Sequence, residues 1–331
     1  MFPDKIYYEP NALSYELGKS LKEKYADKPW IPIQSHNNID ELRKNQNKEF
    51  SRMKQHLIVG IRKTHKFVPN CKVSDYLVPF TSSGCSAICL YCYLVCNYNK
   101  CSYLRVFVNR EQMMHKIIKT ANLSENELTF EIGSNSDLIL ENTVTDNLSW
   151  TVETFAKNGR GFLTFPTKFD MVDPIIPLEH KGRVIFRMSV NPQRIINRVE
   201  FGTSPLKNRI AALNKVCEAD YKAGLLIAPI VLTENWKEDY TKLFEQLADE
   251  LTEKTKKQIF IEIIFMTYSY IHRAINNEAF PKAVELYDKE KMTVRGRGKY
   301  TYKTNVREEC EAFLRGLIVA KLPGVPILYV V

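Results

Sequence analysis

The cysteines with the clearest chemical pattern in this sequence are Cys85, Cys89 and Cys92, which follow Gly84 with the spacing C-x3-C-x2-C. Clustered thiols in a cytosolic chain indicate a metal site, because the cytosol keeps cysteines reduced and disulfides rare. Three thiolates in so short a loop can surround one corner of a [4Fe–4S] cube and leave one iron without a protein ligand. Such an open coordination position is where a substrate or cosubstrate binds. The spacing therefore predicts an iron–sulfur enzyme.

Two other interpretations of these cysteines remain open. The loop could hold zinc, with Cys96 as a fourth ligand, or the three thiols could simply be buried. Zinc usually takes two C-x2-C pairs or a mixed set of cysteines and histidines, and no second cysteine pair appears downstream. The iron–sulfur interpretation is therefore favoured.

The pattern of the chain from about residue 75 predicts the elements that position this loop. Short β-rich runs alternate with longer amphipathic stretches, as in a parallel sheet with helical crossovers. The expected strands are Asp75–Ser82, Leu104–Asn109, Leu128–Gly133, Phe162–Thr167, Val184–Val190, Leu225–Val231 and Ile259–Phe265. The expected helices are Glu111–Ala121, Asp146–Lys157, Lys207–Lys222 and Trp236–Glu253. Nearly continuous apolar strands indicate that both faces of the sheet are covered, in a complete or partial barrel. In such barrels the chemistry gathers at the carboxyl ends of the strands.

Three segments are expected along the chain. Residues 1–74 are more polar and irregular, and we expect an N-terminal extension packed on the core. Residues 75–285 form the barrel. Residues 286–331 hold a basic aromatic segment, a helix over Val306–Ala320 and a final apolar run, Val325–Val331.

Composition limits the class of protein. The chain has 331 residues, of which 44% are hydrophobic, enough for one large α/β domain with attachments or for two smaller domains. No run of eighteen apolar residues exists, so no membrane span is expected. The N-terminus lacks the basic and apolar regions of a secretory signal, which favours a cytoplasmic location.

The net charge of +9 favours a polyanionic partner such as nucleic acid. Basic residues concentrate in two stretches, residues 43–66 and residues 291–303. The second stretch interleaves Tyr300 and Tyr302 with its cations, and this mixture suits nucleic acid because bases stack on rings while cations hold phosphates. Either stretch alone could also be an ordinary solvated face.

The cysteine spacing, the aromatic residue before the third cysteine and the parallel α/β pattern together resemble the radical S-adenosylmethionine superfamily. That resemblance implies an α/β fold with a partial (β/α)6-type TIM barrel. It also implies that the amino and carboxylate groups of S-adenosylmethionine chelate the open iron of a [4Fe–4S] cluster. One electron from the reduced cluster then yields methionine and a 5′-deoxyadenosyl radical.

A longer set of motifs is similar to the spore photoproduct lyase family and keeps its order from about residue 58 to the C-terminus. The motifs are Ile58–Lys66, Cys89–Leu94, Leu104–Asn109, Phe130–Glu131, Ser136–Asp137, Thr167–Lys168, Ser189–Asn191, Gly202–Ser204, Ala228–Ile230 and Gly298–Tyr302. The resemblance implies a carbon–carbon lyase that repairs DNA without light. Its substrate is the methylene-bridged thymine dimer of ultraviolet-damaged spore DNA, which is converted to two thymines after hydrogen is removed from C6 of one base.

The same resemblance implies double-stranded DNA as partner, an electron donor of flavodoxin or ferredoxin type, and a monomer in the cytoplasm or spore core of a spore-forming bacterium. One alternative is a radical S-adenosylmethionine enzyme that acts on another DNA lesion or on a modified nucleotide. A second alternative is a nucleic-acid-binding protein with a structural metal knot and no turnover.

Carried over residue by residue, the resemblance makes Cys85, Cys89 and Cys92 the cluster ligands. It places Ser136, Lys168 and Ser189 at cosubstrate-contacting positions, and Ala228 with Pro229 against the adenine. Lys168 and Ser136 directly follow apolar runs, in agreement with a site at strand ends. The alternatives are a snorkelling lysine for Lys168 and ordinary strand packing for Ala228. Tyr91 and Tyr93 match two tyrosines around the third cysteine, and Tyr93 is the better candidate for radical relay.

One departure from the family bears on mechanism. The family's hydrogen donor is a cysteine at the position of Ser134, and a serine O–H bond is too strong to replace a thiol. We predict that Cys96 donates the hydrogen to the thymine methyl radical and that Tyr93 restores the thiyl. Cys101 is the second candidate, and Cys96 could also be a bystander or an additional metal ligand.

The basic aromatic segment matches a family hairpin that enters the lesion, but without the family's Arg–Tyr pair near its tip. Gly296 and Gly298 suit a tight turn, and the predicted DNA contacts are Arg295, Arg297, Lys299 and Tyr300. A hairpin of this kind would help to hold a damaged base out of the stack.

Overall fold

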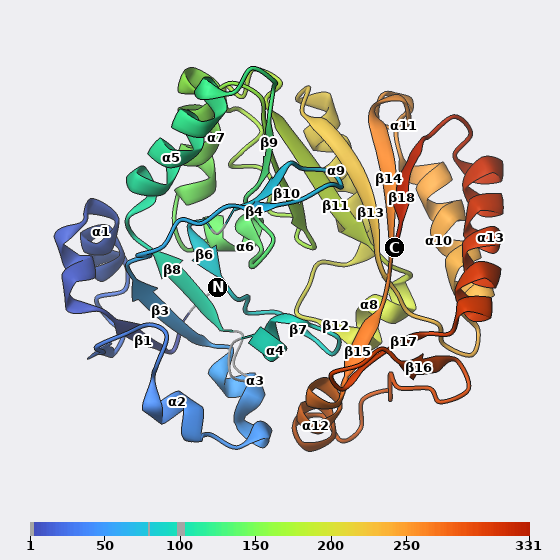
Figure 1. Ribbon diagram of the computed structural model, residues 1–331, viewed down its shortest axis with the longest axis horizontal. Coiled ribbons are helices and arrows are strands. Elements are labelled where there is room, and N and C mark those ends of the chain that lie inside the picture. Colours follow the sequence, from blue (N-terminus) through green and yellow to red (C-terminus); the bar gives the residue numbers. More distant parts are fainter. Residues whose placement is uncertain (1–2, 79, 98–102) are drawn as a thin grey trace.

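The computed structural model describes residues 3–78, 80–97 and 103–331. Its largest element is an eight-stranded sheet in the order β18-β14-β13-β11-β10-β9-β5-β4, in which only β4 is antiparallel to its neighbour. Figure 1 shows this sheet as part of a curved arc with helices such as α5, α7, α10 and α13 on its outer side. The fold is the α/β partial barrel that the sequence predicts.

Most barrel strands lie where the apolar runs predict them. Phe162–Thr167, Val184–Val190 and Ile259–Phe265 begin and end at the predicted residues. The strands of this sheet are β4 (Val68–Pro69), β5 (Tyr76–Leu77), β9 (Thr129–Glu131), β10 (Phe162–Thr167), β11 (Val184–Val190), β13 (Lys222–Ile230), β14 (Ile259–Phe265) and β18 (Ile327–Val330). Helices on the outer face and packed side chains inside leave them little contact with water, which is why their sequences do not alternate.

Two of the helices predicted between the strands agree within two residues, while α9 ends at Glu218, four residues before the predicted limit, because β13 begins at Lys222. The expected helix Trp236–Glu253 is two helices, because Leu251 is extended and the side chain of Thr252 accepts a hydrogen bond from Thr255 N to begin the second. The longer helices are α5 (Arg110–Leu123), α7 (Asn147–Asn158), α9 (Leu206–Glu218), α10 (Trp236–Glu250), α12 (Tyr270–Ala279) and α13 (Thr304–Lys321). The shorter ones are α6 (Leu138–Asn142), α8 (Gln193–Val199) and α11 (Glu253–Gln258).

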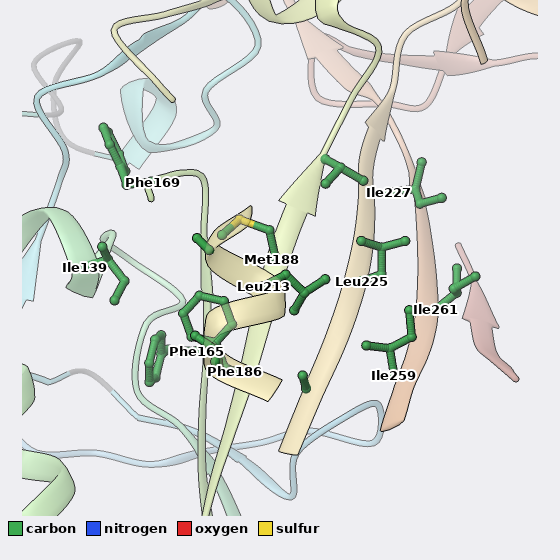
Figure 2. Close-up of a cluster of buried hydrophobic side chains, with 14 of the residues drawn as sticks. Ile139, Phe165, Phe169, Phe186, Met188, Leu213, Leu225, Ile227, Ile259 and Ile261 are labelled. Atoms are coloured by element: carbon green, nitrogen blue, oxygen red, sulfur yellow. The ribbon is translucent and has the colours of Figure 1, made fainter. Parts of the chain in front are cut away.

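The hydrophobic core of the barrel lies between the sheet and these helices. Figure 2 shows Phe165, Phe186 and Leu225 on neighbouring strands, with Leu213 of α9 packed near them. All four side chains are fully buried. Burial of such side chains contributes about 1.5–3 kcal/mol each, so the core fixes the strand ends that carry the site.

Residues 3–74 contain regular elements, which corrects the expectation from the polarity of the N-terminal segment. Three parallel strands from these residues belong to a five-stranded sheet in the order β2-β1-β3-β8-β6. The elements are β1 (Lys5–Tyr8), α1 (Glu16–Lys24), β2 (Trp30–Pro32), α2 (Asp40–Lys44), α3 (Phe50–Met53), β3 (His56–Gly60), β6 (Ser82–Ser83) and β8 (Leu104–Phe107). Short strands between charged segments hid this pattern, although all five residues of β3 are buried.

Two predicted strands therefore pair differently from the expectation. The run Asp75–Ser82 divides into β5 and β6, which belong to different sheets, and Leu104–Phe107 pairs with β3 and β6 instead of with the barrel row. A parallel bridge between Gly84 and Ser136 joins the two sheets. The cysteine loop thus begins at the junction of the sheets.

The C-terminal segment contains the expected hairpin. β16 (Met292–Val294) and β17 (Lys299–Tyr302) are antiparallel, and β15 (Thr267–Ser269) is paired to the other side of β17. Figure 1 shows this small sheet next to α12. Within the described part of the chain, no helix is both long and apolar enough to cross a membrane.

Candidate active site

The cysteine loop is anchored at both ends by backbone pairing. Gly84 has a φ of +81°, a conformation that glycine adopts without strain, and its N–H donates to Asn135 O at 2.7 Å. Cys89 lies in β7 (Ile88–Cys89), which pairs with β12 (Glu200–Phe201) so that Cys89 faces Glu200. The loop then turns at Cys92, whose N–H donates to Cys89 O at 3.0 Å, and continues into α4 (Leu94–Asn97).

Three side chains from distant parts of the chain hold the carbonyl groups of this loop. Lys54 Nζ donates to Cys85 O at 2.7 Å, Asn276 Nδ2 to Leu90 O at 2.8 Å, and His272 Nε2 lies 3.0 Å from Cys92 O. His272 and Asn276 are four residues apart on α12, so they share one face of that helix. Sequence reasoning assigned no role at this site to His272, Lys54 or Asn276. The i, i+4 spacing of His272 and Asn276 was the only sequence pattern that could have indicated a shared role for any of these residues.

The three thiols and the predicted cosubstrate residues line one cavity of about 440 Å³. The predicted residues on its wall are Cys85, Cys89, Cys92, Tyr91, Tyr93, Ser136, Lys168, Ser189 and Ala228. Pro229 and Ser134 line it as well. The strand-end rule therefore located this site, since the wall comes from the ends of β9, β10, β11, β13 and β14.

The chemistry of the thiols fits a metal cluster. Burial raises the pKa of Cys85 to about 12, and burial followed by the charge of Glu200 raises the pKa of Cys89 well above its usual value. Such thiols lose their protons when a metal supplies positive charge. Among the described residues, no three His, Cys, Asp or Glu side chains lie close enough to chelate a single ion. A [4Fe–4S] cube instead binds each cysteine at its own iron.

Lys168 supplies the positive charge of the cavity. Its Nζ donates to Ser189 Oγ at 2.6 Å, to Ala228 O at 2.8 Å and to Glu200 Oε1 at 3.2 Å. Three of the four predicted cosubstrate residues therefore meet at one ammonium group. Such a group can hold the carboxylate of a bound amino acid while Ser189 and Ala228 O fix its direction.

Glu200 is a buried carboxylate that sequence reasoning missed. Burial alone would raise its pKa, but the charges of Lys168 and Arg209 outweigh burial and lower the pKa to about 2. Arg209 Nη2 donates to it at 2.7 Å, Asn191 Nδ2 donates at 2.7 Å, and Tyr91 donates its hydroxyl hydrogen. Burial, then Glu200, raises the pKa of Tyr91. Tyr91 is thus fixed beside the loop as a hydrogen-bond donor.

Ser136 is positioned by two buried acids. Its Oγ lies 2.8 Å from Ser82 Oγ, and Ser82 Oγ donates to Glu141 Oε2 at 2.7 Å. The neighbouring Asp137 accepts from Lys168 N at 2.9 Å and from Thr167 Oγ1 at 2.8 Å, and it also caps α6. Asp137 therefore ties the loop after β9 to the end of β10.

The predicted radical-transfer residues are only partly brought together. Tyr93 is 51% exposed, lines the cavity and donates its hydroxyl hydrogen to Ser134 O, at the position where the family has its donor cysteine. Cys96 does not line the cavity. Its Sγ lies 3.4 Å from Ser269 Oγ and 3.9 Å from His272 Nε2. Cys101, the second candidate, lies outside the described residues.

The predicted DNA contacts lie on the C-terminal hairpin, away from the cavity wall. Arg295, Arg297 and Lys299 are exposed at its turn, where Arg295 N donates to Lys299 O at 2.8 Å. Tyr300 is half-buried, with its ring centroid 4.5 Å from that of Tyr287. β15 connects the two regions, because Thr267 lines the cavity and pairs with Thr301 of the hairpin.

Comparison with known proteins identifies the family of this chain. The family model of spore photoproduct lyase matches residues 1–331. The chain belongs to the spore photoproduct lyase family. It is 33% identical to the spore photoproduct lyase of Bacillus subtilis (strain 168) over 99% of this chain and 98% of that protein. It is 27% identical to the enzyme of Clostridium acetobutylicum over 93% of each chain.

Solved structures of the family agree with this fold over its full length. A spore photoproduct lyase complexed with dinucleoside spore photoproduct has a TM-score of 0.92 and 31% identity over 99% of both chains. A mutant with bound AdoMet and the same lesion gives the same TM-score, identity and coverage. The predicted partial barrel and the lyase class are thereby confirmed for this member of the family.

Proposed function

We propose that the 440 Å³ cavity is where this chain converts the methylene-bridged thymine dimer of spore DNA into two thymines. The observation that carries the proposal is the meeting of three thiols, a lysine and two serines on one wall, in a chain that matches the lyase family from end to end. Family members with bound AdoMet and dinucleoside lesion support the same use of the cavity.

Within the cavity, Cys85, Cys89 and Cys92 would hold the cluster. Lys168 and Ser189 would bind the carboxylate end of S-adenosylmethionine, Ser136 its neighbouring polar groups, and Ala228 with Pro229 the adenine. When bound, the two cofactors supply a 5′-deoxyadenosyl radical that removes hydrogen from C6 of the lesion. Apolar wall residues such as Leu226 and Phe265 exclude water from that radical.

The bridge of the lesion then breaks, and the thymine methyl radical needs a hydrogen atom. We keep Cys96 as the proposed donor and Tyr93 as its relay partner. Cys96 follows Tyr93 by one helical turn, and Cys96 N donates to Tyr93 O at 3.0 Å. Since Cys96 Sγ faces Ser269, donation requires that the thiol turn toward the cavity or that Tyr93 carry the hydrogen atom between them.

The partners follow from the same arrangement. Arg295, Arg297, Lys299 and Tyr300 would contact double-stranded DNA around the lesion. All site residues lie in one chain, which supports a monomer, and an external flavodoxin or ferredoxin would supply the electron that reduces the cluster. The relatives come from Bacillus, Geobacillus and Clostridium, and their homology supports action in the cytoplasm of the spore core.

The test is anaerobic reconstitution of the cluster, reduction, and addition of S-adenosylmethionine with and without the dinucleoside lesion. The proposal expects 5′-deoxyadenosine together with thymine from the lesion. Cleavage of S-adenosylmethionine without thymine would favour action on another lesion, an alternative that the serine at position 134 keeps open. Absence of 5′-deoxyadenosine in both conditions would contradict a radical enzyme.

A further inference from the structure

Two aromatic side chains stand out by their exposure. Among the described Phe, Tyr and Trp residues, only Tyr93 and Tyr270 are exposed, at 51% and 58%. Tyr93 lines the cavity, so its exposure belongs to the site already described. Tyr270 is the first residue of α12 and lies beside the C-terminal hairpin, where no role has been assigned to it.

The ring of Tyr270 is held against the turn of the hairpin. Tyr270 N donates to Gly298 O at 3.2 Å. Gly298 has a φ of +68°, and a Cβ atom there would lie 2.3 Å from Tyr270 Cδ1. Position 298 therefore requires glycine, both for the backbone conformation and for the space that the ring occupies. One face of the ring is covered by the turn, while more than half of the side chain stays open to solvent.

Exposed cations occupy the hairpin turn against which this ring packs. Arg297 and Lys299 flank Gly298 in the sequence, and Arg295 closes the turn through its hydrogen bond to Lys299 O. None of these three cations forms an ion pair with an acid in the described part of the chain. Proteins that hold unpaired nucleotides combine aromatic platforms for the bases with cations for the backbone. Tyr300, by contrast, has its ring against Tyr287 and is half-buried.

The ring also has a fixed position relative to the cavity. Thr267 lines the cavity, and β15 carries the chain from there to Ser269, directly before Tyr270. Three residues of extended chain cover about 10 Å. That length corresponds to roughly three nucleotides along one strand of a duplex at about 3.4 Å each. The same helix, α12, also contacts the cysteine loop through His272 and Asn276.

We propose that Tyr270 is a stacking platform for an unpaired base of the DNA strand that flanks the lesion, about three nucleotides from it. This inference rests on the proposed function, because it assumes that the lesion occupies the cavity. The cations of the turn hold the neighbouring phosphates, and the ring stacks on the exposed face of that flanking base. The contact strengthens the binding of duplexes that carry the lesion. It contributes nothing to the binding of the dinucleoside lesion, which is too short to reach Tyr270.

The test compares Tyr270→Leu, which removes the ring, with Tyr270→Phe, which keeps it, in binding to a duplex that carries the lesion. Binding is measured without reductant, so that no turnover occurs, and 2-aminopurine placed three nucleotides from the lesion reports stacking. The proposal expects about tenfold weaker duplex binding and loss of the stacking signal for Tyr270→Leu, since one base–aromatic stack has a value of this order. Tyr270→Phe should bind like the parent.

A further variant separates stacking from a general effect of surface substitution. Val319→Ala removes another exposed side chain, which lies on α13 and is 73% exposed, and it should leave duplex binding unchanged. Parent-like duplex binding by Tyr270→Leu would overturn the proposal. So would equal losses for the Leu and Phe variants, or a matching loss of repair with the dinucleoside lesion. Failure of the parent to repair the dinucleoside would count against the proposed function, while the binding comparison would still test Tyr270.

Discussion

His272 Nε2 lies 3.0 Å from the backbone oxygen of Cys92, a predicted cluster ligand. The other ring nitrogen, Nδ1, accepts a hydrogen bond from Ser269 N at 3.0 Å, which leaves the proton on Nε2 as the donor to Cys92 O. Burial lowers the pKa of His272 to about 4, so the ring is neutral near pH 7. One imidazole thus joins the start of α12 to the cysteine loop.

Replacement of His272 by Ala should weaken the hold on the cluster. The carbonyl of Cys92 would lose a buried partner, at a cost of about 1–3 kcal/mol, and the loop would gain freedom. We expect fewer iron atoms per chain after reconstitution and faster loss of the cluster to a chelator. The control is His180→Ala, which removes another buried histidine, stacked on Tyr221 at 3.7 Å between centroids. Equal iron retention by the two variants would contradict this role of His272.

Replacement of Lys168 by Met should lower the affinity for S-adenosylmethionine while the cluster remains. Loss of a charge-assisted hydrogen bond costs about 1.5–3 kcal/mol, which corresponds to roughly a 10- to 100-fold higher Kd. Equilibrium binding to the reconstituted, oxidised protein measures this directly. Lys168→Arg keeps the charge in a larger, planar group and should give a smaller loss. As a control, Lys215→Met removes an exposed lysine that pairs with Asp173, and it should leave the Kd unchanged. An equally unchanged Kd for Lys168→Met would exclude the assignment of Lys168 to the cosubstrate.

Replacement of Glu200 by Gln should destabilise the protein in a pH-dependent way. At pH 7 the change leaves the fully buried Arg209 without its carboxylate, which costs about 3–5 kcal/mol. The folded-state pKa of about 2 lies below the ordinary glutamate value of 4.5, so the ionised carboxylate stabilises the fold fully above the unfolded pKa. That contribution disappears as the pH falls through the folded value. The difference in Tm between parent and variant should therefore shrink from pH 5 toward pH 2.

An exposed pair provides the control for Glu200. Glu238 and Lys242 form a solvent-exposed i, i+4 pair on α10, and Glu238→Gln should change Tm little at any pH. A difference for Glu200→Gln that stays constant between pH 5 and pH 2 would show that the carboxylate is not held ionised by Lys168 and Arg209.

The sequence was sufficient to bring together several residues of one cavity wall. The cysteine spacing indicated Cys85, Cys89 and Cys92, and the family resemblance, with its position after an apolar run, indicated Lys168; all four line the cavity. Lys54, His272 and Asn276 were not indicated, because they act on backbone carbonyls more than 30 residues away, and any loop offers such carbonyls.

The same distinction applies to the fold. Long apolar strands such as β11 and β14 depend little on their neighbours, so their limits followed from composition. β8 was placed in the wrong sheet because its partner, β3, comes from the N-terminal segment. The local sequence of a strand does not indicate which distant strand it will pair with. Glu200 was missed for a similar reason, since its partners Lys168, Arg209 and Tyr91 converge only after folding.

The hydrogen donor is tested by comparing thiols one at a time. Cys96→Ser should slow the formation of clean thymine and allow trapped by-products, while the cluster stays intact and 5′-deoxyadenosine still forms. Tyr93→Phe should also slow the formation of thymine, because Tyr93 is the proposed residue that restores the thiyl. Cys71→Ser and Cys101→Ser complete the series, because Cys71 is an exposed free thiol and Cys101 is the second candidate. Parent-rate repair by Cys96→Ser, with the defect appearing in another variant, would assign the donor to that other residue.

The most direct test of the cluster site is the electron paramagnetic resonance spectrum of the reduced, reconstituted protein before and after addition of S-adenosylmethionine. A cluster on Cys85, Cys89 and Cys92 with one open iron predicts about four iron atoms per chain, since [4Fe–4S] is the cluster expected, and a spectrum that changes when S-adenosylmethionine binds. Alanine at any of the three cysteines should abolish both results. Zinc in place of iron, or an iron spectrum that S-adenosylmethionine leaves unchanged, would contradict an open iron–sulfur site in this cavity.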